Sequence, residues 1–211
     1  MNKRIVLAIT GASGAIYATR LMAALLDAGS ELHLTISPSG VAVIKQELGV
    51  SVSLSSFNPK PLVEYQPPWS KRTPFQLSDE AIARLHYHHH EDYMTPIASG
   101  SFLTDAMIVC PCSGSTLAGI ARAASSNLIQ RAAEVHLKEH RKLIMVPRET
   151  PLSVFALENM HRLASAGAIM LPAMPGWYHG VEDLDSLVDF IVGRILDQAG
   201  VGNAMIRRWG E

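Results

Sequence analysis

Thr10-Gly11-Ala12-Ser13-Gly14-Ala15 is the stretch of this sequence that decides its fold. Before it, residues 4–9 form an apolar, β-branched run that predicts a buried parallel strand. After it, residues 16–28 carry apolar side chains at helical spacing and stop at Gly29. A strand, a tight glycine turn and a helix can cradle a phosphate, because glycine admits a ligand close to the backbone and a helix N-terminus offers unpaired N–H groups. Ser13 could cap the helix or donate to that phosphate, and an ordinary serine-capped turn remains the alternative.

The length and composition of the chain fit one compact domain. The 211 residues are 48 % hydrophobic and 18 % charged, as in a well-buried fold. A formal net charge of -1 gives no general attraction to nucleic acid or to anionic membranes, and no apolar stretch is long enough to cross a bilayer. Because Lys3 and Arg4 lead straight into the first strand, we expect no signal peptide. Cys110 and Cys112 suit buried thiols in the cytoplasm rather than a disulfide or zinc framework.

Strand and helix patterns alternate along the rest of the chain. Strands are predicted at residues 31–36, 106–110, 142–146 and 168–172, and helices at about 40–48, 127–139, 152–166 and 183–199. This alternation predicts an α/β, Rossmann-like (flavodoxin-like) three-layer sandwich with a mostly parallel sheet. We expect a single domain over residues 1–211.

Residues 50–90 interrupt the alternation and look like a divergent, insertion-like segment. Its five prolines between positions 59 and 74 mark loops, and residues 78–85 predict one short capped helix. Near-consecutive histidines at its end point to different faces of a strand or helix, and no nearby set of carboxylates and cysteines completes a ligand count. We therefore expect no metal, and interpret the cluster as a solvated or interface loop. The histidines are His86, His88, His89 and His90.

The turns after the predicted strands should converge on one crevice, because ligands of such sheets bind beyond the carboxyl ends of the strands. Hydroxyls, backbone N–H groups and aromatic rings dominate this set, which suits a planar, phosphorylated ligand. A nicotinamide dinucleotide is disfavoured, since Ile36 and Ser37 stand where dinucleotide-binding folds place an acid for the ribose. The converging residues are Ser13, Ser37, Ser113 to Thr116, Arg148 with Glu149, and Trp177 with Tyr178.

Six motifs, in order along the chain, resemble those of the UbiX-type flavin prenyltransferases. They lie at residues 10–15 (TGASGA), 98–101 (ASGS), 111–113 (PCS), 131–139 (RAAEVHLKE), 146–151 (VPRETP) and 178–179 (YH). The resemblance covers nearly the whole chain except residues 50–90. It implies a homododecamer that transfers a dimethylallyl group from dimethylallyl phosphate, or the diphosphate, to N5 and C6 of reduced FMN. The implied product, prenylated FMN, would serve a UbiD-type decarboxylase, as in ubiquinone biosynthesis.

Carried over position by position, the resemblance implies distinct sets of site residues. FMN would be held by Gly11, Ala12, Ser13, Ser37, Ser113, Gly114, Ser115, Thr116 and Arg148. The isoprenoid phosphate would be held by Lys138, Tyr178 and Arg194, with Arg131 contributed by a neighbouring subunit. Glu47, Glu149 and Lys138 would act at the reacting centre, and Tyr93 and Trp209 match aromatic positions near it.

These residue types are consistent with a metal-independent transfer. Lys138 and Arg194 can neutralise a leaving phosphate, and the sequence lacks the aspartate-rich magnesium motif of prenyl-diphosphate enzymes. Aromatic rings such as Trp177 can stabilise an allylic cation. Glu149 could transfer a proton at the flavin, unless it forms a local ion pair with Arg148.

Three other functions remain open from the sequence. The opening motif resembles that of the short-chain dehydrogenases, but these enzymes need a Tyr-x-x-x-Lys pair that this sequence lacks. A flavin-dependent cysteine decarboxylase shares the wider fold, but has a Pro-x-Met-Asn-type segment where this chain has residues 147–151. A flavin carrier without turnover would not need a second phosphate pocket beside the flavin.

Overall fold

The computed structural model describes residues 2–178, 180–208 and 210. Among these residues, six parallel strands form one sheet in the order β3-β2-β1-β4-β5-β6. This is the order of a doubly wound Rossmann sheet, in which the direction of winding reverses between β1 and β4. The predicted α/β sandwich is confirmed. The strands are β1 (Arg4–Ile9), β2 (Glu31–Ile36), β3 (Leu85–Tyr87), β4 (Ala106–Cys112), β5 (Lys142–Pro147) and β6 (Ile169–Met170).

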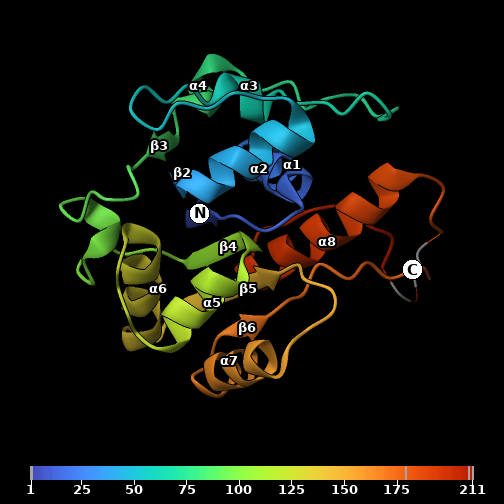
Figure 1. Ribbon diagram of the computed structural model, residues 1–211. Coiled ribbons are helices and arrows are strands. Elements are labelled where there is room, and N and C mark those ends of the chain that lie inside the picture. Colours follow the sequence, from blue (N-terminus) through green and yellow to red (C-terminus); the bar gives the residue numbers. More distant parts are fainter. Residues whose placement is uncertain (1, 179, 209, 211) are drawn as a thin grey trace.

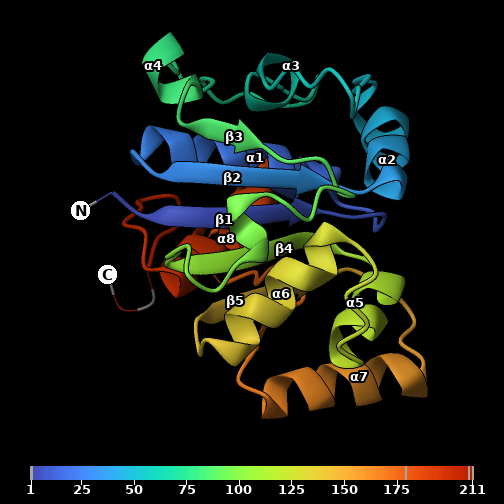
Figure 2. The same ribbon diagram turned by 90° about the vertical axis from the view of Figure 1, so that its left-hand side faces the viewer.

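Helices cover both faces of this sheet (Figure 1). One group is α1 (Ala15–Asp27), α2 (Pro38–Leu48) and α8 (Leu184–Ala199), and the other is α5 (Gly114–Ala121), α6 (Leu128–Lys138) and α7 (Val154–Ser165). In the view turned by 90°, α6 lies in front of the strands, and α1 and α8 lie behind them (Figure 2). Short elements complete the described chain: α3 (Lys60–Val63), α4 (Asp79–Ile82) and the 3-10 turn η1 (Pro96–Ala98).

The central strand β1 contributes to two separate hydrophobic cores. Leu7 and Ile9 pack in the core beneath α1 and α8, whereas Val6 and Ala8 pack in the core beneath α5 and α6. Successive side chains of a strand point to opposite faces, so a strand covered on both sides must be apolar throughout. This burial explains why residues 4–9 read as one continuous apolar run.

The helix ends follow the capping signals of the sequence. The Ser37 hydroxyl accepts the Gly40 N–H at the start of α2, with Pro38 in the first helical position. Asn127 and Asp183 cap α6 and α8 in the same way. The predicted last strand, residues 168–172, is shorter: β6 has two residues, and Pro172 beyond it has no N–H to pair.

The helix predicted at residues 78–85 is shorter, since α4 ends at Ile82, and the loop interpretation of residues 86–90 is wrong at its start. β3 pairs with the outer edge of β2, in register with Leu32, His33 and Leu34. This pairing brings Glu31 and His33 beside His86, so a carboxylate and a second imidazole do lie close to the histidine cluster.

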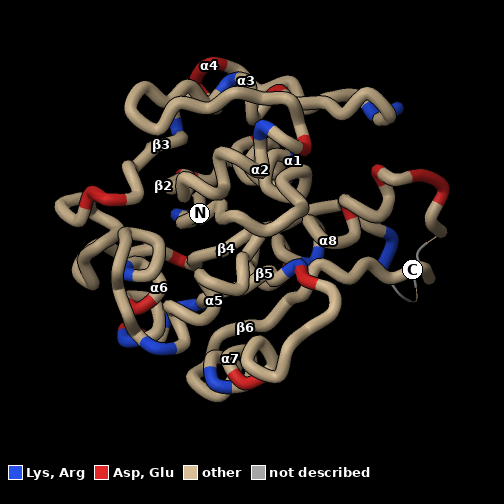
Figure 3. Tube along the Cα trace, in the orientation of Figure 1, with Lys and Arg blue, Asp and Glu red and all other residues tan. Residues whose placement is uncertain are grey.

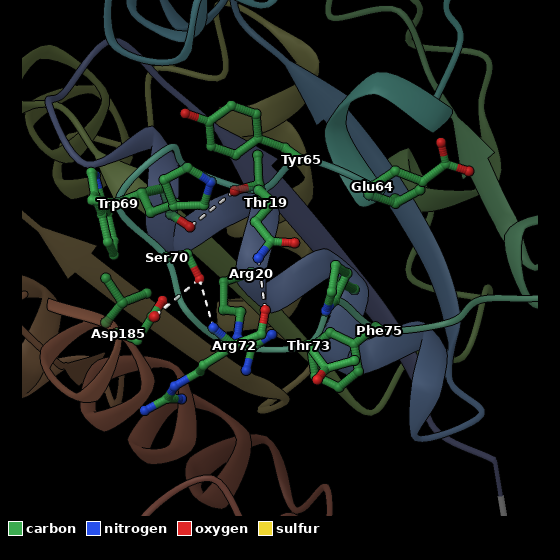
Figure 4. A pocket seen from close by; sticks show the side chains of 17 residues that line it. Thr19, Arg20, Glu64, Tyr65, Trp69, Ser70, Arg72, Thr73, Phe75 and Asp185 are labelled. Atoms are coloured by element: carbon green, nitrogen blue, oxygen red, sulfur yellow. Dashed lines mark hydrogen bonds between the residues drawn. The ribbon is translucent and has the colours of Figure 1, made fainter. Parts of the chain in front are cut away.

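Residues 63–75 are fastened to the outer side of α1 and α8 by buried charges. The Arg20 guanidinium donates twice to the buried Asp189 carboxylate, at 2.9 and 3.2 Å, and Arg72 pairs with the same group. Ser70 donates to Asp185 at the start of α8, at 3.0 Å (Figure 4). The Arg20 guanidinium also lies over the Phe75 ring, 4.4 Å from its centroid. These contacts attach the divergent segment to α1 and α8.

Charge is mixed over the molecule. Basic and acidic positions are interspersed along the chain trace (Figure 3), so binding of an anion must depend on local groups. Within the described residues, no helix combines the length and the apolar character needed to span a membrane.

Candidate functional site

The two turns at the winding reversal are locked together by one buried hydroxyl. Thr10, at the end of β1, donates from Oγ1 to the carbonyl of Pro111 at 2.7 Å and accepts the N–H of Ser113 at 2.8 Å. Its own N–H donates to the same carbonyl at 3.2 Å. The reversal point is where an open parallel sheet forms its ligand crevice. Thr10 therefore fixes the relative position of both turns at the expected site.

A carboxylate occupies the N-terminus of α1. Glu47, on α2, accepts the N–H groups of Gly14 and Ala15 at 2.9 and 2.8 Å. Its negative charge complements the positive end of the helix. Ser13 does not cap α1, so that alternative is wrong; instead its backbone carbonyl accepts Arg148 Nε at 3.1 Å.

The first turn of α2 presses against the β1–α1 turn. A Cβ on Gly11 would lie 2.6 Å from Ser39 Cβ, and a Cβ on Gly40 would lie 2.8 Å from the carbonyl oxygen of Ile9. The Ser37 N–H donates to that carbonyl at 3.0 Å, and the Ser37 and Ser39 hydroxyls are 3.1 Å apart. Glycines at positions 11 and 40 therefore bring two serine hydroxyls against the backbone of the opening motif.

The N-terminus of α5 is capped by its own serine. The Ser113 hydroxyl accepts the Thr116 N–H at 3.3 Å and lies 3.0 Å from the Thr116 hydroxyl and 3.2 Å from the Ser115 hydroxyl. Gly114 and Ser115 are exposed, and a Cβ on Gly114 would meet nothing within 4 Å. A ligand could approach this helix end without displacing a side chain.

Arg148 follows β5 and reaches the opening motif. It is half-buried through its bond to Ser13, and within the described chain it forms no ion pair with its neighbour Glu149. The alternative of a local Arg148–Glu149 pair is therefore not observed. Burial raises the pKa of the nearby Tyr17 phenol, and the Arg148 cation opposes this shift only in part.

The thiol beside the α5 turn is buried. Burial raises the pKa of Cys112 to about 12, so its thiolate is scarcely populated at neutral pH.

Two adjoining hollows lie beyond Arg148. The first, about 270 Å³, is lined by Arg148, Glu149, Pro172 and Met174. The second, about 310 Å³, runs along β6 and α8 and shares Pro172 and Met174 with the first. Arg194 lines the second hollow. Tyr178 borders it through Phe190, against which its ring packs edge-on with centroids 5.8 Å apart.

Two of the predicted phosphate ligands lie on α6, and one of them does not reach this crevice from its own chain. Arg131 donates to the carbonyl of Ala98, and Lys138 lies beside Gly100 and pairs with Glu139. Lys138 ends α6 just before β5 begins. It therefore lies near the amino ends of the strands, whereas the crevice lies at their carboxyl ends.

The aromatic residues are dispersed. The Tyr93 hydroxyl donates to the carbonyl of Ser125 at 3.2 Å, near the start of α6, and Trp177 is 71 % exposed. Trp209 and His179 lie outside the described residues.

Sequence reasoning missed Thr10 and Ser39 as parts of the site. Thr10 carries a recognisable signal, because a polar residue directly after an apolar central strand must find buried partners. Ser39 carries none, because its role depends on where α2 packs.

Comparisons with known proteins agree with this geometry. Residues 1–196 match the model of the family described as Flavoprotein. The chain is 42 % identical over 203 residues to "Flavin prenyltransferase UbiX" of Halalkalibacterium halodurans, covering 96 % of this chain and 91 % of the relative.

Two solved structures share the fold along the full chain. A crystal structure of AnUbiX (PadA1) in complex with FMN and dimethylallyl pyrophosphate has a TM-score of 0.83 at 36 % identity, covering 100 % of this chain and 99 % of that one. A dodecameric FMN-dependent UbiX-like decarboxylase from Escherichia coli O157:H7 has a TM-score of 0.79 at 38 % identity, covering 99 % and 100 %.

Proposed function

The chain belongs to the flavoprotein family and, within it, to the UbiX flavin prenyltransferases, and we propose on this premise that it joins a dimethylallyl group to N5 and C6 of reduced FMN. The flavin is thus a substrate of this transferase. The residue assignment rests on one observation. The opening motif, the α5 turn and Arg148 lie together where the winding of the sheet reverses.

The donor groups of the crevice fit FMN. Its phosphate would be held where Gly11 and Ala12 meet the hydroxyls of Ser37 and Ser39, because Glu47 already fills the N-terminus of α1. Ser13 would contribute through the backbone that Arg148 anchors. The ring system would lie against the open α5 turn, formed by Ser113, Gly114, Ser115 and Thr116. Reduced flavin supplies the nucleophilic N5 and C6 atoms of the reaction.

Two carboxylates are our candidates for proton transfer. Two N–H groups hold Glu47 at the carboxyl end of β1, so its carboxylate has a fixed position beside the proposed flavin site. Glu149 is exposed and lines the first hollow next to Arg148. We assign both to acid–base work at the reacting centre, because carboxylates within reach of a substrate atom can accept or deliver a proton.

The isoprenoid phosphate fits the second hollow. Arg194 faces this hollow and is 45 % exposed at its side chain, with Asp197 as an ion-pair partner at 3.3 Å. A phosphate would compete with Asp197 for the guanidinium, and Tyr178 would add a hydroxyl. A bound cation of this kind stabilises the charge that develops on a leaving phosphate.

Arg131 and Lys138 would complete the phosphate site of another copy of the chain, since Lys138 lies at the opposite end of the strands from the crevice of its own chain. A homododecamer, as described for the Escherichia coli relative, would supply such copies. We further propose that a UbiD-type decarboxylase receives the product, and that the protein works in the cytoplasm, where the buried thiols of Cys110 and Cys112 would stay reduced.

The test is a single-turnover assay under anaerobic conditions. Purified protein is mixed with reduced FMN and either dimethylallyl phosphate or the diphosphate, and mass spectrometry follows the flavin. We expect a flavin that has gained one five-carbon unit. Arg194→Ala should slow its formation at least tenfold while FMN binding is retained, and Arg162→Ala, an exposed arginine on α7, should not. Tight FMN binding with no prenylated product from either donor would support a carrier instead.

A further inference from the structure

Three histidines and a glutamate meet at the β2–β3 edge of the sheet, away from the turns of the crevice. Glu31 and His33 stand two residues apart on β2 and therefore project from the same face. His86 on β3 is in register with His33, so its ring stands beside the His33 ring, with centroids 5.0 Å apart. The pairing of β3 alone creates this cluster.

The ligand atoms have the spacing of a metal site. Glu31 Oε1 lies 3.1 Å from His33 Nε2 and 3.8 Å from His86 Nε2, and one donor atom from each residue lies within 4.8 Å of the other two. Bonds of about 2.0–2.1 Å in a tetrahedral zinc site place ligand atoms roughly 3.3–3.5 Å apart. We propose that Glu31, His33 and His86 bind one Zn²⁺ ion, with a fourth position open to water.

The surrounding groups already orient these ligands. Arg4 Nε donates to Glu31 Oε2 at 3.0 Å, which leaves Oε1 directed at the two imidazoles. His88 Nε2 lies 2.9 Å from His33 Nδ1 and can accept its proton when Nε2 of His33 binds the metal. A hydrogen-bonded partner on the second ring nitrogen is the usual companion of a metal-binding histidine.

The proposed site is buried on one side and open on the other. The His33 side chain is 5 % exposed. The His86 side chain is 47 % exposed, which leaves an entry path for the ion.

The zinc ion would have a structural role, because none of its ligands belongs to the proposed flavin crevice. An ion shared by β2 and β3 would tie the end of the divergent segment to the sheet. Metal binding to the folded state alone raises the unfolding temperature. Prenyl transfer should not require it.

The test uses untagged protein, dialysed against chelator and titrated with ZnCl₂ in a calorimeter. We expect one Zn²⁺ per chain and a rise in unfolding temperature on zinc addition. His86→Asn should weaken binding at least tenfold, and His88→Asn should weaken it about 10- to 100-fold through loss of the orienting partner. His161→Asn, an exposed histidine on α7, is the matched control and should bind zinc like the parent protein.

Cobalt gives a second, direct readout. Co²⁺ in place of Zn²⁺ should give the intense visible absorption of a four-coordinate ion in the parent protein and lose it in His86→Asn. Absence of zinc binding at 100-fold molar excess, or equal binding by the parent and His86→Asn, would overturn the proposal. Retained FMN binding and prenyl transfer in His86→Asn would show that its fold and the proposed function are separate from this result.

Discussion

The turn after β1 and the turn after β4 have similar residues, but different groups occupy the helix N-termini that follow them. Both are short runs of glycine, serine and threonine that open a helix at the winding reversal, and Thr10 joins them. The N-terminus of α1 is filled by the Glu47 carboxylate from another helix. The N-terminus of α5 is capped by its own Ser113 and faces open space at Gly114.

The difference shows that a glycine-rich turn before a helix is not by itself a place for a phosphate. A helix N-terminus attracts whatever negative group lies nearest, and a carboxylate on a neighbouring helix is as suitable as a ligand. In this chain the first turn positions an acid, and the second turn leaves room for a planar ring. Four substitutions test that division, taken from the largest expected change in stability to the smallest.

Thr10→Val should break both turns at once. Valine keeps the shape of the side chain but leaves the buried Ser113 N–H without its acceptor and removes the bond to the Pro111 carbonyl. Loss of such buried partners costs about 2–3 kcal/mol of unfolding free energy, which urea denaturation measures. Thr19→Val is the control, because the buried Thr19 hydroxyl bonds only within its own helix. Equal losses in the two variants would mean that the link between the turns is unimportant.

Gly11→Ala should strain the first turn alone. The added methyl group would meet Ser39 Cβ at 2.6 Å, and that atom can move only with the backbone of α2. Overpacking of this kind costs about 1–2 kcal/mol, measured again by urea denaturation. Adding Ser39→Gly should recover part of the loss, since it removes the atoms that clash. A double variant with no recovery would contradict the proposed close contact.

Glu47→Ala should uncap α1 and leave α5 intact. Loss of a helix cap costs about 1 kcal/mol. Glu47→Gln keeps an acceptor oxygen and should cost less in stability. Both variants should slow prenyl transfer at least tenfold if Glu47 moves a proton, whereas Gln46→Ala on the same helix should not. A fully active Glu47→Gln enzyme would reduce Glu47 to its capping role.

Gly114→Ala should leave stability almost unchanged, within about 0.5 kcal/mol, because its methyl group meets open space. If the flavin ring lies against α5, the same methyl group should weaken FMN binding at least tenfold in a fluorescence titration. Gly202→Ala, which also faces open space, should change neither quantity. Unchanged FMN affinity in Gly114→Ala would move the ring away from this turn.

The sequence predicts the parts of this molecule that depend on local burial. The strands at residues 4–9 and 31–36 were predicted to the residue. The first is an apolar run after Arg4, and the second alternates polar residues with leucine and isoleucine. The serine and proline at the start of α2 are a local signal of its cap as well. β3 escaped prediction because three residues with a half-exposed face carry no clear alternation.

Contacts between distant segments could not be predicted in the same way. Nothing near Glu47 in the sequence says that it will cap a helix 32 residues earlier. The resemblance to the family assigns both Lys138 and Arg194 to the phosphate. In the structure, Lys138 lies near the amino ends of the strands, opposite the crevice. A list of site residues holds no information about which copy of the chain supplies each one.

The anchoring of residues 63–75 has a consequence for protein engineering. Asp185 and Asp189 sit on α8 and hold the segment through Ser70, Arg20 and Arg72. The chain between this anchor and β3 is attached to the sheet at its two ends. We therefore expect the exposed position Gln76, ahead of α4, to accept an inserted peptide, provided that both attachments are kept, whereas an insertion within α4 should disturb the buried Ala81 and Ile82.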